Sequence, residues 1–288
     1  MLRSMFSAVS GLRSHQTMMD VTGNNIANIN TAGYKAQRTT FQETLTQLVR
    51  GGTQGQAGDA GGQNPMQVGL GVQVSATDLI FAQGASQVTG RPIDVAIQGD
   101  GFFVVQGPNE VFYSRAGAFS WDSAGQLVTP NGEMVLGYPL DESGEPDPAL
   151  PAPPAPVPQP GTIVSIDPEE HTDVTIDSTG RVIGRNAETG EPDFLFQLGM
   201  ARFANTGGME RAGNGLFRGS PAAGAAIYGT PGGDQGHGSL QAGTLEMSNV
   251  DLAAEFTNLI LSQRGFQANA RTITTSDELL QELVNLKR

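Results

Sequence analysis

The chain lacks cysteine, and it contains neither a long apolar run nor the apolar start of a secretory signal peptide. Without cysteine there are no disulfides and no thiolate-bound metals. No run of about 18 apolar residues occurs, so we expect no membrane insertion. Residues 1–12 contain Ser, Gly and an early Arg where a cleaved signal needs an apolar stretch. These absences alone suggest the cytoplasm, unless export uses a route without a cleaved signal.

Basic residues are scarce as well. The 16 Lys and Arg residues are outnumbered by 29 Asp and Glu residues, which gives a net charge of −13. A nucleic-acid-binding protein needs a basic surface, so the composition excludes that partner. It also disfavours binding to an anionic membrane. A negative charge of this size is typical of a protein that stays soluble when secreted or crowded.

The residue patterns of catalysis and metal binding are also missing. The three histidines, His15, His171 and His237, lie far apart in the sequence, and no GxSxG elbow occurs. The acidic stretch 167–173 is either a cation site or a solvated loop, and the second reading is favoured. The GDG at 99–101 lacks a GxGxxG continuation and is read as a turn between strands. We therefore expect no catalytic residue, no metal and no cofactor.

What the chain does contain is a turn-rich centre with 39 Gly and 17 Pro residues. Apolar residues alternate with polar ones in several short stretches, which predicts strands. Two segments, SWDSAGQLVT and TIDSTGRVIG, resemble copies of one hairpin. Asp122 and Asp177 open the two turns, and Gly125 and Gly180 close them at positions that favour positive φ.

Each end of the chain carries an apolar stripe with spacings of three and four. The first stripe comprises Leu2, Met5, Val9, Leu12, Gln16, Met19 and Ile26, with Gly23 in its one gap. The second comprises Leu252, Phe256, Leu259, Gln263, Phe266, Ala270, Ile273, Leu280 and Val284, with Asp277 in its gap. This spacing predicts helices that pack on other helices. Neither stripe has a partner nearby, so the two helices meet each other or copies from other chains.

Polar residues interrupt or follow the first stripe and sit in the second. Gln16 and Gln263 fix the register between helices, as buried polar residues do in coiled coils, or they simply face water. Asn24, Asn25 and Asn28 are poor helix formers whose side chains bond neighbouring backbones. We expect an assembly role for these asparagines, with an ordinary helix terminus as the alternative.

Together these patterns predict an α+β protein in which two terminal helices form a coiled-coil-like pair and the centre is an all-β domain. The expected domains are an N-terminal helix in 1–35, an extended or flexible connection in 36–75, a β-rich domain in 76–243, and a C-terminal helix in 244–288. The Pro-rich stretch 146–160 predicts a polyproline II spacer, with a partner-binding segment as the alternative.

Two capping signals mark the C-terminal region. Ser248 with Asp251 resembles a capping box that opens the last helix, and Thr275 with Glu278 repeats the signal. The repetition predicts a helix that is broken or bent near Thr274.

Several sequence blocks resemble those of the bacterial flagellar rod and hook proteins, and they occur in the family's order. They are GNNIAN at 23–28, NTAGYK at 30–35, NP at 64–65 with QVGLG at 67–71, DVAI at 94–97, GFF at 101–103, YSRAGAF at 113–119, LVTPNG at 127–132, LGY at 136–138, LEMSNVD at 245–251, QRGFQAN at 263–269 and TTSDE at 274–278. Because the blocks reach both ends of the chain, their joint specificity is high.

The resemblance implies a structural protein and not an enzyme. Its hook-like details imply a subunit of the extracellular hook, in which many copies form a hollow, flexible tube that transmits torque from rod to filament. The implied partners are further copies, the distal rod, the hook cap, the hook–filament junction proteins and the flagellar export apparatus. The family implies type III export without a cleaved signal, with the terminal helices lining the channel.

Two alternatives to the hook subunit remain, one from differences between this chain and the family and one from a different class of protein. The short length is also close to that of the distal rod protein, and the proline run at 146–160 is not associated with the family. A reading from a different class is a secreted β-rich binding module with helical oligomerisation ends.

Overall fold

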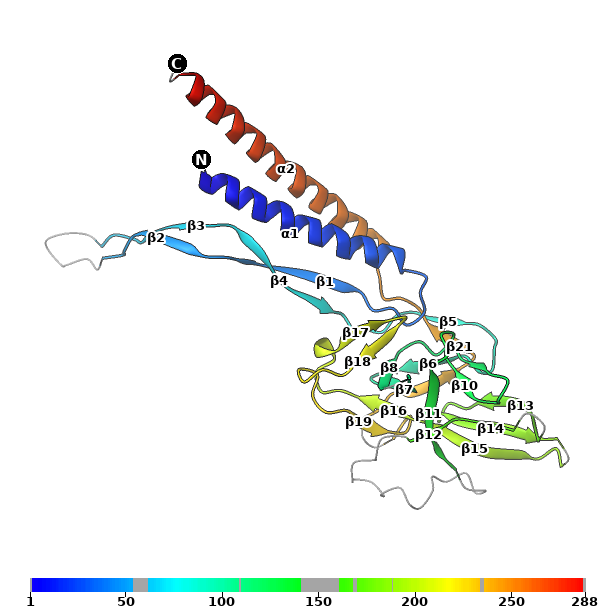
Figure 1. The fold of residues 1–288 in the computed structure, drawn as a ribbon. Coiled ribbons are helices and arrows are strands. Elements are labelled where there is room, and N and C mark those ends of the chain that lie inside the picture. Colours follow the sequence, from blue (N-terminus) through cyan, green and yellow to red (C-terminus); the bar gives the residue numbers. More distant parts are fainter. Residues whose placement is uncertain are drawn as a thin grey trace. The chain divides into compact units, whose positions relative to one another are not determined.

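The structure is a computed structural model that describes residues 2–53, 62–108, 110–140, 161–167, 170–187, 189–233 and 236–286. The predicted α+β class is confirmed, since the two terminal helices pack together and the centre of the chain is rich in strands (Figure 1). The chain forms two compact units. The helical unit comprises Met1–Ala27, Gln37–Asp78 and Asp251–Arg288, and the β unit comprises Asn28–Ala36 and Leu79–Val250.

The helical unit contains two long helices and a strand ribbon. Helix α1 spans Leu2–Ala27 and α2 spans Leu252–Asn285. The ribbon has two pairs of strands: β1 (Gln37–Glu43) pairs with β4 (Val72–Leu79), and β2 (Thr46–Arg50) pairs antiparallel with β3 (Met66–Gly69). The stretch 36–75, expected to be an extended or flexible connection, is thus largely paired strand where it is described.

The β unit is dominated by a 13-stranded sheet whose main path runs β13-β14-β15-β11-β7-β8-β18-β17. Two further pairs, β20 with β6 and β21 with β5, complete the unit. The bounds are β5 Ser86–Val88, β6 Val95–Gln98, β7 Phe102–Gln106, β8 Val111–Ser114, β9 Ser120–Trp121, β10 Leu127–Val128, β11 Met134–Pro139, β12 Thr162–Ile163, β13 His171–Ile176, β14 Arg181–Asn186, β15 Pro192–Leu198, β16 Met200–Arg202, a 3₁₀ turn Thr206–Gly208, β17 Glu210–Gly213, β18 Leu216–Arg218, β19 Ile227–Gly229, β20 Ser239–Ala242 and β21 Thr244–Glu246.

The strand β7 lies between two hydrophobic cores. Successive side chains of a strand point to opposite faces. Phe103 and Val105 accordingly belong to one buried cluster, while Phe102 and Val104 belong to the other. All four are at most 2% exposed, so this apolar run is the central strand of the unit.

The two predicted hairpin turns are confirmed. Gly125 N–H donates to the carbonyl of Asp122 at 3.0 Å, and Gly180 N–H donates to that of Asp177 at 2.9 Å. Both glycines have positive φ, 73° and 74°. The Asp122 carboxylate accepts a backbone bond from Ala124 at 2.8 Å, so the aspartate closes its turn as the sequence pattern indicates.

The C-terminal region differs from its prediction in two ways. Helix α2 begins at Leu252, and its N-cap Asp251 accepts bonds from two backbone N–H groups of the first turn. Residues 244–246, expected within the helical segment, form β21 because they pair with β5. The predicted break or bend near Thr274 is wrong, since α2 is continuous there and is drawn without a kink in Figure 1. The Thr275 hydroxyl donates to the carbonyl of Arg271 within the helix, so it does not cap a new one.

The N-terminal helix ends at Ala27, and the residues that follow it join the β unit. The Pro-rich stretch 146–160 and residues 54–61 of the Gly-rich stretch lie outside the described residues. Within the described parts of the chain, neither helix combines the length and the hydropathy that crossing a bilayer requires.

Candidate functional site

The helix pair is the first candidate site, and its register is antiparallel. The Cα of Gly11 faces the amide of Asn269, that of Gly265 faces the ring of His15, and Asn25 bonds to Glu255. In all three pairs the residue numbers add to 280. The two helices therefore run past each other in a single, constant register.

The buried positions of both helices hold small or polar residues. They are Ala8, Gly11, Ser14, Thr22, Asn25, Ser262 and Ser276. A β-carbon built on Gly11 would lie 2.6 Å from the Asn269 amide nitrogen, and one on Gly265 would lie 2.5 Å from the His15 ring. Small residues thus let the helices approach closely, but they bury little apolar area.

The large apolar residues of the predicted stripes lie mostly at the surface or half-buried. Exposed members are Val9, Leu252, Phe256, Phe266 and Val284. Half-buried members are Met5, Leu12, Met19, Ile26, Leu259, Ala270, Ile273 and Leu280. Leu2 lies at the start of α1, and its side chain is outside the described part. Phe6, Ile260 and Leu261, which the stripes did not include, are exposed too. The pair therefore presents an apolar outer surface.

The polar candidates separate into different environments. Gln16 and Gln263 are exposed, as is Asn24, while Asn28 is half-buried in the segment that joins the β unit. Only Asn25 is fully buried, at 1% exposure. None of the described contacts tests an assembly role for these residues, which stays a prediction.

Asn25 holds the end of α1 against the start of β1. Its amide nitrogen donates to the carbonyl of Gln37 at 2.8 Å and to the Glu255 carboxylate at 3.1 Å. Its amide oxygen accepts from the Gln37 N–H at 3.0 Å. The side chain thus pairs with a backbone as a neighbouring strand does. Burial beside this network raises the pKa of Glu255, and the Asn25 bond partly opposes that shift.

Replacing Asn25 by alanine should weaken the helical unit. The change leaves the partly buried backbone N–H and carbonyl of Gln37 without their side-chain partner, which costs about 1–3 kcal/mol. Chemical unfolding of the monomer, followed by helical circular dichroism, measures the loss. The exposed Gln16→Ala in the same helix is the matched control. Equal stability of the two variants would contradict the role of Asn25 as a clamp.

The close approach of the helices predicts opposite effects of alanine at two glycines. Gly265→Ala places a methyl group against the His15 ring, and overpacking of this kind costs about 1–3 kcal/mol. Gly23→Ala meets nothing within 4 Å, so the better helix propensity stabilises α1 by about 1 kcal/mol. Thermal unfolding of the two monomers should show shifts of opposite sign, and stabilisation by both changes would exclude close packing at Gly265.

A buried ionic cluster in the β unit is the second candidate site. Lys35 Nζ and Arg115 Nε each lie 2.7 Å from a different carboxylate oxygen of Glu246. The three residues are 1%, 5% and 2% exposed, respectively. Arg115 also donates to the carbonyl of Gly99 at 2.6 Å, and Lys35 donates to that of Ala82 at 2.9 Å. Both cations therefore share one carboxylate, and backbone carbonyls accept hydrogen bonds from their remaining N–H groups.

Burial and charge act against each other in this cluster. Burial raises the pKa of Glu246, but the Arg115 charge and the hydrogen bonds from both cations outweigh it and hold the pKa below its usual range. Burial lowers the pKa of Lys35, an effect that Glu246 partly offsets. The carboxylate is thus the group on which the cluster depends, because both cations need it.

Acid should weaken the β unit through Glu246. Its pKa is depressed on folding, so its contribution is complete above the ordinary value of 4.5 and is lost as the pH falls through the lower, folded value. Unfolding measured between pH 7 and pH 3 should show a decline below pH 4.5, and Glu246→Gln should flatten it. Glu210→Gln is the control, since Glu210 is an exposed glutamate of the same unit. An unchanged slope in Glu246→Gln would contradict this linkage.

The cluster ties the segment 28–36 into the β unit. Gly33 N–H donates to the Glu246 carbonyl at 2.8 Å, and Ala36 N–H donates to the Asn249 side chain at 2.7 Å. Asn249 donates in turn to the carbonyl of Ile80 at 2.7 Å. Gly33 has φ of +69°, and a β-carbon there would lie 2.6 Å from the Ala116 nitrogen. These contacts therefore hold the segment after α1 in one specific backbone conformation.

The sequence patterns did not reveal this cluster. Lys35, Arg115 and Glu246 lie within the blocks NTAGYK, YSRAGAF and LEMSNVD, yet no spacing in the sequence pairs them. The one hint in the sequence was that each of these blocks contains a charged residue among mostly uncharged ones. Among the described residues, His, Asp and Glu form no group of three that is suited to a metal ion.

Three regions of the chain match known protein families. Residues 5–35 match the family described as "Flagella basal body rod protein". Residues 96–184 match "Flagellar hook protein FlgE/F/G D1 domain", and residues 241–286 match "Flagellar basal body rod FlgEFG protein C-terminal". The matched regions include most of α1, much of the β unit and α2.

Curated relatives match over the whole length. The flagellar basal-body rod protein FlgG of Bacillus subtilis is 43% identical over 288 residues, which cover both chains completely. FlgG of Caulobacter vibrioides is 35% identical over 288 residues, covering 99% of this chain and 100% of the relative. The flagellar hook protein FlgE of Borreliella burgdorferi is 30% identical over 444 aligned positions that cover 100% of both chains.

Proposed function

The chain belongs to the flagellar basal-body rod and hook family of structural, non-enzymatic proteins, and within that family we propose that it is a subunit of the distal rod. The observation that carries the proposal is similarity over equal length. The rod relative of Bacillus subtilis aligns over 288 residues, whereas the alignment with the hook relative spans 444 positions and leaves long gaps in this shorter chain. The similarity thus favours the alternative over the hook subunit that the motifs suggested.

Proteins of this family form helical axial assemblies in the flagellar rod and hook. The chain's own surface supports such an assembly. Its helix pair leaves large side chains such as Phe6, Phe256 and Ile260 exposed, and its ribbon does the same with Leu45 and Leu48. Phe256 and Ile260 lie one turn apart on α2, and neighbouring exposed apolar side chains of this kind are typical of a protein–protein interface. The helix seams and the polar residues Asn24, Asn25, Asn28, Gln16 and Gln263 are accordingly proposed as assembly positions.

The proposed partners follow from a place in the rod. Further copies form the tube, and the hook continues it outward. Export through the flagellar type III apparatus is proposed together with this place in the rod. The hook cap and the hook–filament junction proteins are implied only by the hook alternative and are not part of this proposal.

A deletion strain tests the assignment. Cells that lack this protein should stop before the distal rod is complete, and isolated basal bodies viewed by electron microscopy should carry neither a finished rod nor a hook. Expression of the wild-type chain should restore both structures. Complete rods without hooks in the deletion strain would instead support the hook assignment and overturn this proposal.

A further inference from the structure

We propose that residues 279–286, the last turns of α2, dock into a groove between α1 and β4 of a second copy of this chain. This inference rests on the proposed axial function and deepens it by naming the contact. The name "overhang" is used for residues 279–286, and "ribbon groove" for the space between Phe6–Thr17 of α1 and Val72–Val74 of β4.

The overhang follows from the register of the helix pair. With residue numbers that add to 280, Leu2 at the start of α1 lies opposite Glu278. No described residue of α1 therefore faces the overhang, which continues for about 12 Å at 1.5 Å per residue. Leu279 and Leu283 are each 51% exposed, Val284 is 66% exposed and Leu286 is 83% exposed. This run of apolar surface lacks a cover within the described helix pair.

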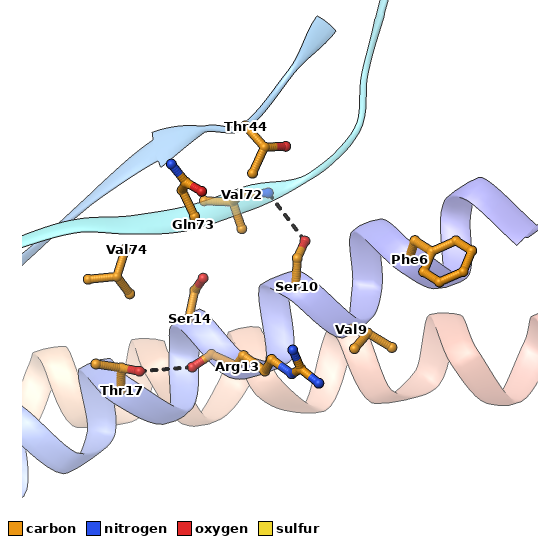
Figure 2. A pocket seen from close by; sticks show the side chains of 10 residues that line it. All are labelled: Phe6, Val9, Ser10, Arg13, Ser14, Thr17, Thr44, Val72, Gln73 and Val74. Carbon is orange, nitrogen blue, oxygen red and sulfur yellow. Dashed lines mark hydrogen bonds between the residues drawn. The ribbon is translucent and has the colours of Figure 1, made fainter. Parts of the chain in front are cut away.

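The ribbon groove is a hollow with valines on one side, which can accept the apolar side chains of one face of a helix end. It has a volume of about 520 Å³. Figure 2 shows Val72 and Val74 on the β4 side, opposite the small side chains of Ser10 and Ser14 on α1. The Val72 N–H donates to the Ser10 hydroxyl at 3.2 Å, which fixes the strand against the helix. Small residues on the floor leave room for side chains from outside.

The rim of the groove matches the overhang in charge. Arg13 lies at the groove, is exposed and forms no ion pair among the described residues (Figure 2). On α2, Glu278 and Glu282 stand one turn apart, next to Leu279 and Leu283, which are also one turn apart. Glu282 thus places a negative charge beside the apolar row of the overhang, and Glu278 lies just before the overhang begins. A basic side chain likewise accompanies the apolar lining of the groove.

The overhang of the same chain does not reach this groove. By the register, residues 6–17 of α1 face residues 274–263 of α2, and α2 continues straight past them to Asn285. The occupant is therefore a second copy. Because groove and overhang are different surfaces of one chain, the contact is head-to-tail and repeats from copy to copy. Where the rotation between copies does not close on itself, such a contact yields an open helical assembly.

Disulfide trapping tests this contact. Because the sequence contains no cysteine, only the introduced cysteines can form disulfides. Gln73 lies at the groove, and Gln281 lies on the overhang next to its apolar row. The double variant therefore carries Gln73→Cys and Gln281→Cys. In assembled tubes of the double variant, mild oxidation should give a ladder of covalent oligomers on a non-reducing gel. Each single variant should give dimers at most, and the dilute double variant should stay monomeric.

A charge exchange provides the second measurement. Arg13→Glu should raise the critical concentration for tube formation severalfold, and adding Glu282→Arg should restore it. Tubes that form without a ladder, or an exchange that does not restore assembly, would overturn the docking while leaving the axial function intact. A wild-type chain that forms no tubes under any condition would contradict the axial function and the docking with it.

Discussion

Replacing Glu246 by glutamine is expected to lower the free energy of unfolding of the β unit by about 3–5 kcal/mol, because it leaves two buried cations without their counter-charge. The carboxylate accepts bonds from Lys35, from Arg115 and from the Gly84 backbone. A glutamine offers one oxygen where two are used, and its amide nitrogen faces another donor. The loss of charge and the loss of an acceptor therefore act together.

The experiment is chemical unfolding followed by the fluorescence of Trp121, the single tryptophan, which packs against the main core of the β unit. The matched control is Glu210→Gln, since Glu210 is an exposed glutamate of β17 in the same unit. Adding Lys35→Met to Glu246→Gln should recover part of the loss, because one uncompensated cation is removed. A Glu246→Gln protein as stable as the control would show that the cluster contributes little.

The architecture was largely predictable because it rests on local patterns. The continuous apolar run Phe102–Val105 indicated a strand, and the Asp and Gly residues of the two hairpins indicated turns, since both signals depend on near neighbours. The predicted bend at Thr274 was wrong for the opposite reason. A threonine that could cap a new helix can also lie inside a continuous one. The Thr274 hydroxyl does so here, by donating to the carbonyl of Arg271 one turn earlier.

The sites were less predictable because their contacts join distant segments. Lys35 and Glu246 are 211 residues apart, so no spacing rule pairs them. The apolar stripes correctly indicated helices that need partners. They did not reveal that the buried positions are small and polar residues such as Ser14 and Ser262, because a serine in a helix reads as a surface residue. The apolar stripe and the buried face of a helix coincide only when the helix is packed on all its apolar sides.

The second large effect concerns that outer apolar surface. Phe256→Ser combined with Ile260→Ser should abolish tube formation, while the free energy of unfolding of the monomer falls only by about 1–3 kcal/mol, the part of their burial already present in the single chain. The two side chains are one turn apart on α2 and are 49% and 57% exposed in the single chain. Complete burial of a large apolar side chain contributes about 1.5–3 kcal/mol of stabilisation. Because these two side chains are roughly half exposed, contact with a second copy can supply roughly half of that for each. In the double variant this stabilisation is lost at every contact between copies, so the whole assembly is weakened.

Two measurements on the same preparation separate assembly from folding. Helical circular dichroism of the dilute monomer reports folding, and sedimentation with electron microscopy of the concentrated protein reports tubes. Gln267→Ser, an exposed polar change on α2, is the matched control and should assemble normally. If the double variant forms tubes at the wild-type concentration, the outer face of α2 at Phe256 and Ile260 is not a subunit contact. The apolar surface that joins the copies must then lie elsewhere, with the exposed Leu45 and Leu48 of the ribbon as the next residues to change.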